Sequence, residues 1–161
     1  VIIDFDVFFP IQISVKKKNH GDLINLKSLS PLLNEAKDCC KKTIGEKKII
    51  HMIIDSYQIN DKHSSDLPKN LKCNNFSLDV SFICLSNTLI KNLEEILKKY
   101  QISLSQIISA NYIKNFPVDD EKNIFFMTKK IIEGHNPNEV MLIEKTVQNQ
   151  GFFEKFFNFF S

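Results

Sequence analysis

The chain has 161 residues, which suits one domain of ordinary size plus an appendage, and 43% of its residues are hydrophobic, enough to supply a core. Its 21 basic residues are all lysines, and the formal net charge of +2 is close to balance. Without arginine the chain lacks the side chain that reads guanine edges and clamps phosphates with two hydrogen bonds, so we expect no nucleic-acid partner.

Two strands are predicted near the N-terminus, over residues 1–7 and 11–16, from β-branched and aromatic residues and a period-two alternation. The Asn-His-Gly-Asp turn at residues 19–22 then leads to a short run, residues 23–26, that we expect to pair as a third strand. The lysines before the turn are explained more simply as part of a solvated hairpin than as a phosphate-binding track.

A helix is predicted next, with Ser30 as N-cap and Pro31 at the first helical position. It should run to about Thr43 and end at Gly45, where a left-handed cap is easy. The β-branched run over residues 48–59 predicts a central strand.

The polar stretch over residues 60–75 predicts an exposed loop, and residues 76–85 alternate cleanly as a strand. One face of that strand should hold Phe76, Leu78, Val80 and Phe82.

The helix with the clearest pattern is predicted to begin at Ser86, and a last strand or strand-like return should follow over residues 102–109. The helix should bury one apolar stripe, made of Leu89, Ile90, Leu93, Ile96, Leu97 and Tyr100. The order of elements predicts an α+β fold, a small mixed sheet with two helices on one face.

The pattern weakens after residue 116. Residues 124–132 are apolar but interrupted by lysines, residues 134–138 predict a linker or sharp turn, and residues 140–147 suit either a strand or a short helix. We therefore treat residues 117–150 as a connecting segment.

The sequence offers little for binding a cofactor or a metal. Its four glycines are isolated, so no phosphate-binding loop and no nucleotide are expected. His51 falls on the predicted central strand, His20 and His63 in turns and His135 in the linker, without metal-ligand spacing. We expect no metal and no cofactor.

Catalytic candidates are equally sparse. Asp4 and Asp6 share one face of the first predicted strand, as paired catalytic carboxylates would, but a solvated edge explains them as well. Cys84 precedes a helix N-terminus, which lowers a thiol pKa, although a strand end more often holds a buried structural cysteine. The four cysteines form no CxxC motif and predict reduced thiols in the cytoplasm. No catalytic residue and no enzyme activity are expected, and the apolar start of the chain is too short to span a bilayer.

The most informative segment is the C-terminal stretch, residues 151–161. Wound as a helix, it places its phenylalanines on an arc of about 160° and its polar residues on the rest. Such a helix suits the headgroup boundary of a membrane, and the residues that would bind it are Phe152, Phe153, Phe156, Phe157, Phe159, Phe160 and Lys155. Alternatively, the Phe face docks into the core of this protein or into a groove on a partner.

Taken in order, these segments resemble FtsA, the actin-like bacterial protein that tethers division filaments to the inner membrane. Ile49-Ile50-His51-Met52 with Tyr57 resembles the family's ILHVLP...Y strand, and residues 68–85 resemble its DPxGM...L.VD..VVT segment. Residues 89–108 are similar to the helix and return strand that follow, and Tyr112 falls where some members carry PYAS. The similarity covers residues 1–116, and the last eleven residues match in character only.

The resemblance implies a domain division and a role. Residues 1–116 would form an interaction module like FtsA subdomain 1C, of the SHS2-like kind, followed by the connecting segment and, over residues 151–161, the amphipathic helix. The family's glycine-rich phosphate loop is replaced by Ile124-Phe125-Phe126-Met127, and nothing resembles its ATP-binding domains or the subdomain that grips FtsZ, so ATP binding and FtsZ binding are not implied.

We therefore expect a non-catalytic cell-division adaptor, cytoplasmic and peripheral on the inner face of the membrane, that contacts itself or other division proteins. The alternatives are a vestigial or structural fragment of a division gene and a PilM-like pilus scaffold module.

Overall fold

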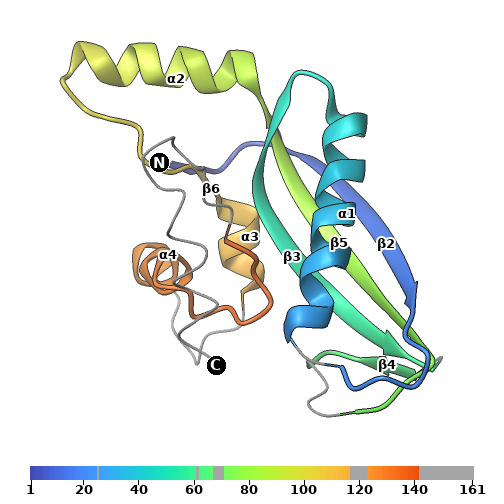
Figure 1. Ribbon diagram of the computed structural model, residues 1–161. Coiled ribbons are helices and arrows are strands. Elements are labelled where there is room, and N and C mark those ends of the chain that lie inside the picture. Colours follow the sequence, from blue (N-terminus) through green and yellow to red (C-terminus); the bar gives the residue numbers. More distant parts are fainter. Residues whose placement is uncertain (25, 61, 67–70, 117–122, 142–161) are drawn as a thin grey trace.

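The chain folds around a four-stranded antiparallel sheet with the strand order β2-β5-β3-β4 (Figure 1). The computed structural model describes residues 1–24, 26–60, 62–66, 71–116 and 123–141. The sheet consists of β2 (Phe9–Lys18), β3 (Lys47–Ile59), β4 (Lys62–Ser64) and β5 (Asn75–Ser86). A separate parallel pair joins β1 (Ile2–Ile3) to β6 (Ile108–Ser109). The protein is thus a small α+β fold, as predicted, although its main sheet is antiparallel and not mixed.

One face of the sheet is covered by α1 (Leu26–Ile44). The helix buries a stripe with the three-to-four residue spacing of an amphipathic helix, made of Leu29, Leu32, Ala36, Cys40 and Ile44. Against it lie the predicted face of β5, which is almost completely buried, and Val15 of β2. The alternation on β5 is therefore confirmed, and it places the largest core on this side of the sheet.

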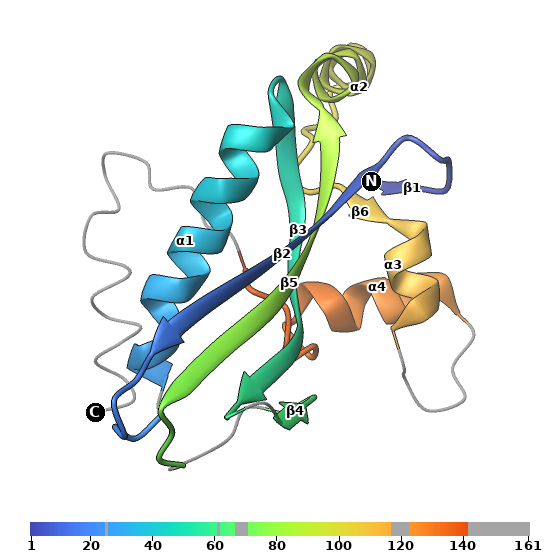
Figure 2. The same cartoon turned by 90° about the vertical axis from the view of Figure 1, so that its right-hand side faces the viewer.

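The opposite face is covered by two short helices, α3 (Ala110–Asn115) and α4 (Ile124–Ile132) (Figure 2). Their buried side chains form a second core with β6 and with Ile53 and Ile83, which project from β3 and β5 away from α1. The prediction of two helices on one face is wrong, because helices lie on both faces of the sheet.

The remaining helix, α2 (Asn87–Lys99), leaves the end of β5 and projects beyond the sheet (Figure 1). Its start after Ser86 is as predicted, although the Ser86 side chain makes no capping hydrogen bond. Only Ile90 is buried, and Leu89 and Leu93 are half-buried in a third cluster. The predicted stripe is therefore buried at its beginning and exposed at its end, where Ile96 is 52% and Tyr100 is 72% exposed.

Two β-bulges explain why β3 shows no simple alternation. They fall between Ile49 and His51 and between Ile54 and Ser56. Each bulge adds a residue to β3, so that the side chains facing α1 are Ile49, Met52, Ile54, Tyr57 and Ile59. The first bulge also lies beside His51, which is buried on the side of α3.

The start of the chain departs from the prediction. Only Ile2–Ile3 of residues 1–7 form a strand, and β2 begins earlier than expected, at Phe9. The third strand over residues 23–26 is absent, since only an isolated bridge joins Leu23 to Lys72 before α1 begins at Leu26. The first helix thus starts five residues earlier than predicted and contains Pro31, because its apolar stripe already begins at Leu29.

The connections are mostly as expected. His20 and Gly21 form the predicted turn with positive φ, and Gly45 ends α1 with a φ of +57°. The polar loop contains the short strand β4, so His63 lies on a strand and not in a turn. Of residues 102–109, only Ile108–Ser109 form a strand.

The part of the chain taken as a connection includes ordered packing. α4 packs against α3, and Asn138–Val140 lie along β3 through two backbone hydrogen bonds. The predicted membrane-binding residues of segment 151–161 and the alternatives for residues 142–147 lie outside the described residues.

Candidate functional site

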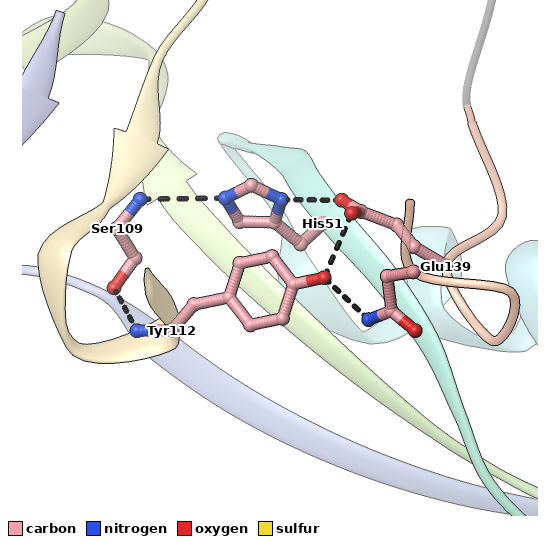
Figure 3. A network of polar contacts seen from close by, with 5 residues as sticks. His51, Ser109, Tyr112 and Glu139 are labelled. Carbon is pink, nitrogen blue, oxygen red and sulfur yellow. Dashed lines mark hydrogen bonds and ion pairs between the residues drawn. The ribbon is translucent and has the colours of Figure 1, made fainter. Parts of the chain in front are cut away.

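The most elaborate polar arrangement is a buried network centred on His51 of β3, drawn in Figure 3. The His51 side chain is 1% exposed, and its Nδ1 lies 2.8 Å from Oε1 of Glu139. Its Nε2 accepts a hydrogen bond from the backbone N–H of Ser109, at 3.3 Å. The sheet, the start of α3 and the turn after α4 thus meet at one imidazole ring.

The hydrogen bonds assign the protonation of the ring. Because Nε2 accepts from a backbone N–H, it carries no proton, and the proton of the neutral ring lies on Nδ1. Nδ1–H therefore donates to the Glu139 carboxylate, which is the stronger, charge-assisted kind of bond. Both nitrogens are occupied, so the ring has no free position for accepting a proton from a substrate.

Tyr112 of α3 completes the network. Its hydroxyl donates to Oε2 of Glu139 at 2.7 Å and accepts from Nδ2 of Asn136 at 2.7 Å. Its ring lies 4.6 Å from the His51 ring, centroid to centroid. Burial raises the pKa of the Tyr112 hydroxyl, and the hydrogen bond to Glu139 raises it further, so the hydroxyl stays protonated as a donor.

We call this hydrogen-bonded network the latch. It consists of His51, Ser109, Tyr112, Asn136 and Glu139. It ties the turn after α4 and the first turn of α3 to the inner strand β3. Ser109 adds a local contact, since its hydroxyl accepts from the backbone N–H of Tyr112 as the N-cap of α3. A Glu–His pair can also serve general-base catalysis, but here the far nitrogen accepts from the backbone N–H of Ser109.

The cysteines show the properties of structural thiols. Sγ of Cys40 on α1 lies 4.0 Å from Sγ of Cys84 on β5, and both side chains are fully buried. Burial raises the pKa of the Cys84 thiol to about 12, which opposes formation of a thiolate nucleophile. Cys39 is the exposed member of the four.

The two aspartates at the start of the chain do not form a pair of carboxylates on a strand. Both follow β1, Asp6 in a bend, and Asp4 makes an exposed ion pair with Lys114 of α3, at 2.8 Å. The histidines are also dispersed: His135 contacts the end of α4 through the carbonyl of Lys130. In the ranges that the structure describes, no three His, Cys, Asp or Glu side chains are grouped as metal ligands.

The part of the sheet that α3 and α4 leave uncovered carries a ladder of polar contacts. Asp79 of β5 accepts hydrogen bonds from Ser14 of β2 and Ser56 of β3, each at 2.6 Å. These two bonds, that from Ser14 foremost, hold the pKa of the Asp79 carboxyl below its usual value. Asp79 thus links the three long strands across the open face of the sheet.

The edge strand β2 has a long outer edge without a strand partner among the described residues. It pairs with β5 over ten residues from Phe9 to Lys18, and no other described strand lies against its outer edge. Proline at position 10 lacks an N–H, which suits a site where that group would point away from β5. Since the backbone N–H groups of successive residues point to opposite edges of a strand, we expect the N–H of Gln12, two residues on, to face the open edge as well.

The sequence pointed to some of these residues and missed others. His51 was placed on the correct strand, and a buried histidine requires partners. Glu139 was missed, because nothing in its local pattern indicates that the turn after α4 returns to β3. The predicted membrane-binding phenylalanines and Lys155 cannot be placed in this geometry, since they lie outside the described residues.

Comparisons with known proteins identify no family: no protein-family model matches the chain, and no curated protein matches it significantly. Among the helices that the structure describes, none is long and apolar enough to cross a membrane.

Proposed function

We propose that the chain is a non-catalytic adaptor of the cell-division type that its sequence resembles. Its α+β module would contact a second copy or another division protein, and its Phe-rich C-terminal segment would bind the inner face of the cell membrane. The observation that carries the proposal is the open edge of β2 on a sheet that α1 closes from one side.

The order of elements supports the resemblance to FtsA subdomain 1C. β2, α1, β3 and β5 come in the order strand, helix, strand and strand, with the short β4 between β3 and β5. Next come α2, β6 and α3, in the place of the helix and return strand that the resemblance implies. The finer fold assignment remains part of this proposal.

The open edge suits recognition by strand addition, in which main-chain hydrogen bonds supply affinity and alternate side chains supply specificity. Ile11 and Ile13 are half-buried against the α1 side, and Gln12 between them is exposed. Pro10 and the lysines at positions 16–18 flank this stretch, and such residues usually restrict pairing at an edge. The usable edge is therefore short, which favours a weak and reversible contact.

The polar groups support binding over catalysis. Both nitrogens of His51 are occupied within the latch, and the pKa of the buried Cys84 thiol is raised. The His51 network and the buried Cys84 thiol are therefore better suited to holding the module rigid than to reacting with a substrate.

Sedimentation velocity over a rising protein concentration tests the edge. Gln12→Pro removes an N–H that faces outward and adds a ring at the edge, whereas the matched control Gln12→Ala keeps the N–H. We expect the unmodified chain and Gln12→Ala to form larger species at high concentration and Gln12→Pro to remain monomeric. If Gln12→Pro associates as the unmodified chain does, the β2 edge is not the contact surface.

A further inference from the structure

The second half of α2 presents an apolar surface that the described structure covers only in part. We define the α2 stripe as Leu93, Ile96, Leu97 and Tyr100, which fall on an arc of about 100° at helical spacing. The stripe continues the buried positions of the same helix: Ile90 packs in the third cluster, whereas Ile96 and Tyr100 are mostly exposed. One apolar face is thus half in the core and half in water.

The last described residues run toward the end of the sheet from which α2 leaves. Asn138 accepts from the N–H of Ile54, and Val140 donates to the carbonyl of Met52, so this segment runs antiparallel to β3 toward the strand's beginning. At that end Lys47 pairs with Ser86, the residue directly before α2. At Met141, the last described residue before the C-terminal segment, the chain is therefore directed toward the end of the sheet from which α2 leaves.

The remaining chain is long enough to reach the stripe. Ten residues, the length of segment 142–151, span about 17 Å in root-mean-square terms in the general case of a flexible chain. Ile96 lies about ten helical residues beyond Ser86, which corresponds to about 15 Å along the axis. The starting point is also close, because Ile50 of β3 belongs to the same cluster as Leu89 and Leu93.

The C-terminal segment has the apolar composition that a partner for the α2 stripe requires. We infer that residues 152–160 dock through their phenylalanines on the α2 stripe of the same chain, giving a closed form of the protein. The flanks of the stripe carry both signs of charge, including Glu94 and Lys98, and the segment itself carries Glu154 and Lys155, so no net repulsion opposes docking.

Tethering favours this occupant over a second copy. A short flexible linker gives an effective concentration on the order of 1 mM, so a contact with a dissociation constant of about 1 mM is half formed within one chain. The docking does not depend on membrane binding. Its consequence, that a docked segment is withheld from the membrane, rests on the proposed function.

Backbone amide shifts test the docking directly. We compare the intact chain, labelled with ¹⁵N, with a chain that ends at Gln150, in buffer without lipid. The expected result is a set of shift differences concentrated between Leu93 and Tyr100 and independent of protein concentration. Overlapping spectra over α2 overturn the inference, and so do differences that grow with concentration, because those indicate a second copy.

A pair of variants links the shifts to the stripe. In the intact chain, Ile96→Asp should return the other α2 amides to their positions in the truncated chain. The matched control is Phe125→Asp on α4, whose side chain is 73% exposed and should leave the α2 shifts unchanged. Both changes are at exposed side chains, so the fold should be kept. If Ile96→Asp keeps the shifts of the intact chain, the stripe is not the docking site.

Vesicles separate this inference from the proposed function. If half of the chains are closed, Ile96→Asp should raise the fraction bound to anionic vesicles about twofold at low lipid concentration. Docking seen by shifts together with no vesicle binding by any variant keeps the docking and refutes the membrane role. Vesicle binding without docking shifts keeps the membrane role and refutes the docking.

Discussion

Replacing Tyr112 with phenylalanine measures how much the latch stabilises the protein. The substitution keeps the aromatic ring against His51 and removes only the hydroxyl, which donates to Glu139 and accepts from Asn136. A hydrogen bond to a charged group contributes about 1.5–3 kcal/mol, and the Glu139 side chain is 12% exposed, so water replaces part of the loss. We expect Tyr112→Phe to lower the free energy of unfolding by about 2 kcal/mol.

The assay is urea unfolding at neutral pH, checked by thermal unfolding, where the same change corresponds to about 4–8 °C for a chain of this size. Tyr100→Phe is the matched control, since Tyr100 is exposed on α2 and its change should stay within about 0.5 kcal/mol. If both variants change stability equally, the hydroxyl of Tyr112 does not hold the latch.

The same variant predicts a change in pH dependence. Because the folded-state pKa of Tyr112 is raised above the unfolded value, its contribution is complete below pH about 10 and is lost as the pH rises further. The stability difference between Tyr112→Phe and the unmodified protein should therefore narrow above pH about 10. A constant difference up to alkaline unfolding contradicts this assignment.

Two further predictions concern other buried or bonded groups. Asp79→Asn should lower the free energy of unfolding at neutral pH and flatten its dependence on acid pH. The reason is that the depressed pKa of the Asp79 carboxyl contributes stability above pH about 4, and this contribution is lost as the pH falls through the folded-state pKa. Urea unfolding between pH 2 and 7 checks this, and a loss of stability in acid that equals that of the unmodified protein contradicts it. In a thiol-titration assay of the native protein, the exposed Cys39 should react fast, and the buried thiols only at the rate at which the fold opens; these are Cys40, Cys73 and Cys84. Rapid reaction of all four thiols would show that the core under α1 is not closed.

Those parts of the fold with strong local patterns could be predicted from the sequence. Residues 76–82 of β5 alternate between apolar and polar, and the glycine after α1 adopts the expected left-handed conformation. β3 was recognised by composition, but its bulges break the alternation, so the side chains that face α1 could not be assigned in advance. Helices α3 and α4 were missed because each is short and the apolar pattern of α4 is interrupted by two lysines, of which Lys129 is exposed and Lys130 is half-buried.

The features that were predicted wrongly from the sequence depend on long-range contacts. The start of α1 was placed at the proline because proline favours a first turn, yet the core selects Leu29 and moves the boundary. The stripe on α2 was predicted as buried throughout, because a sequence pattern cannot show where the sheet beneath the helix ends. Glu139 and His51 lie 88 residues apart, and only the return of the chain along β3 brings them together.

The most direct test of the adaptor account is co-sedimentation with anionic and neutral vesicles, comparing the intact chain with a chain that ends at Gln150. The account predicts that only the intact chain pellets, that pelleting increases with protein concentration as weak anchors combine, and that Phe156→Asp abolishes it. If neither chain pellets at concentrations where the protein associates, and Ile96→Asp does not change this, the Phe-rich segment is not a membrane anchor and the proposed function is wrong.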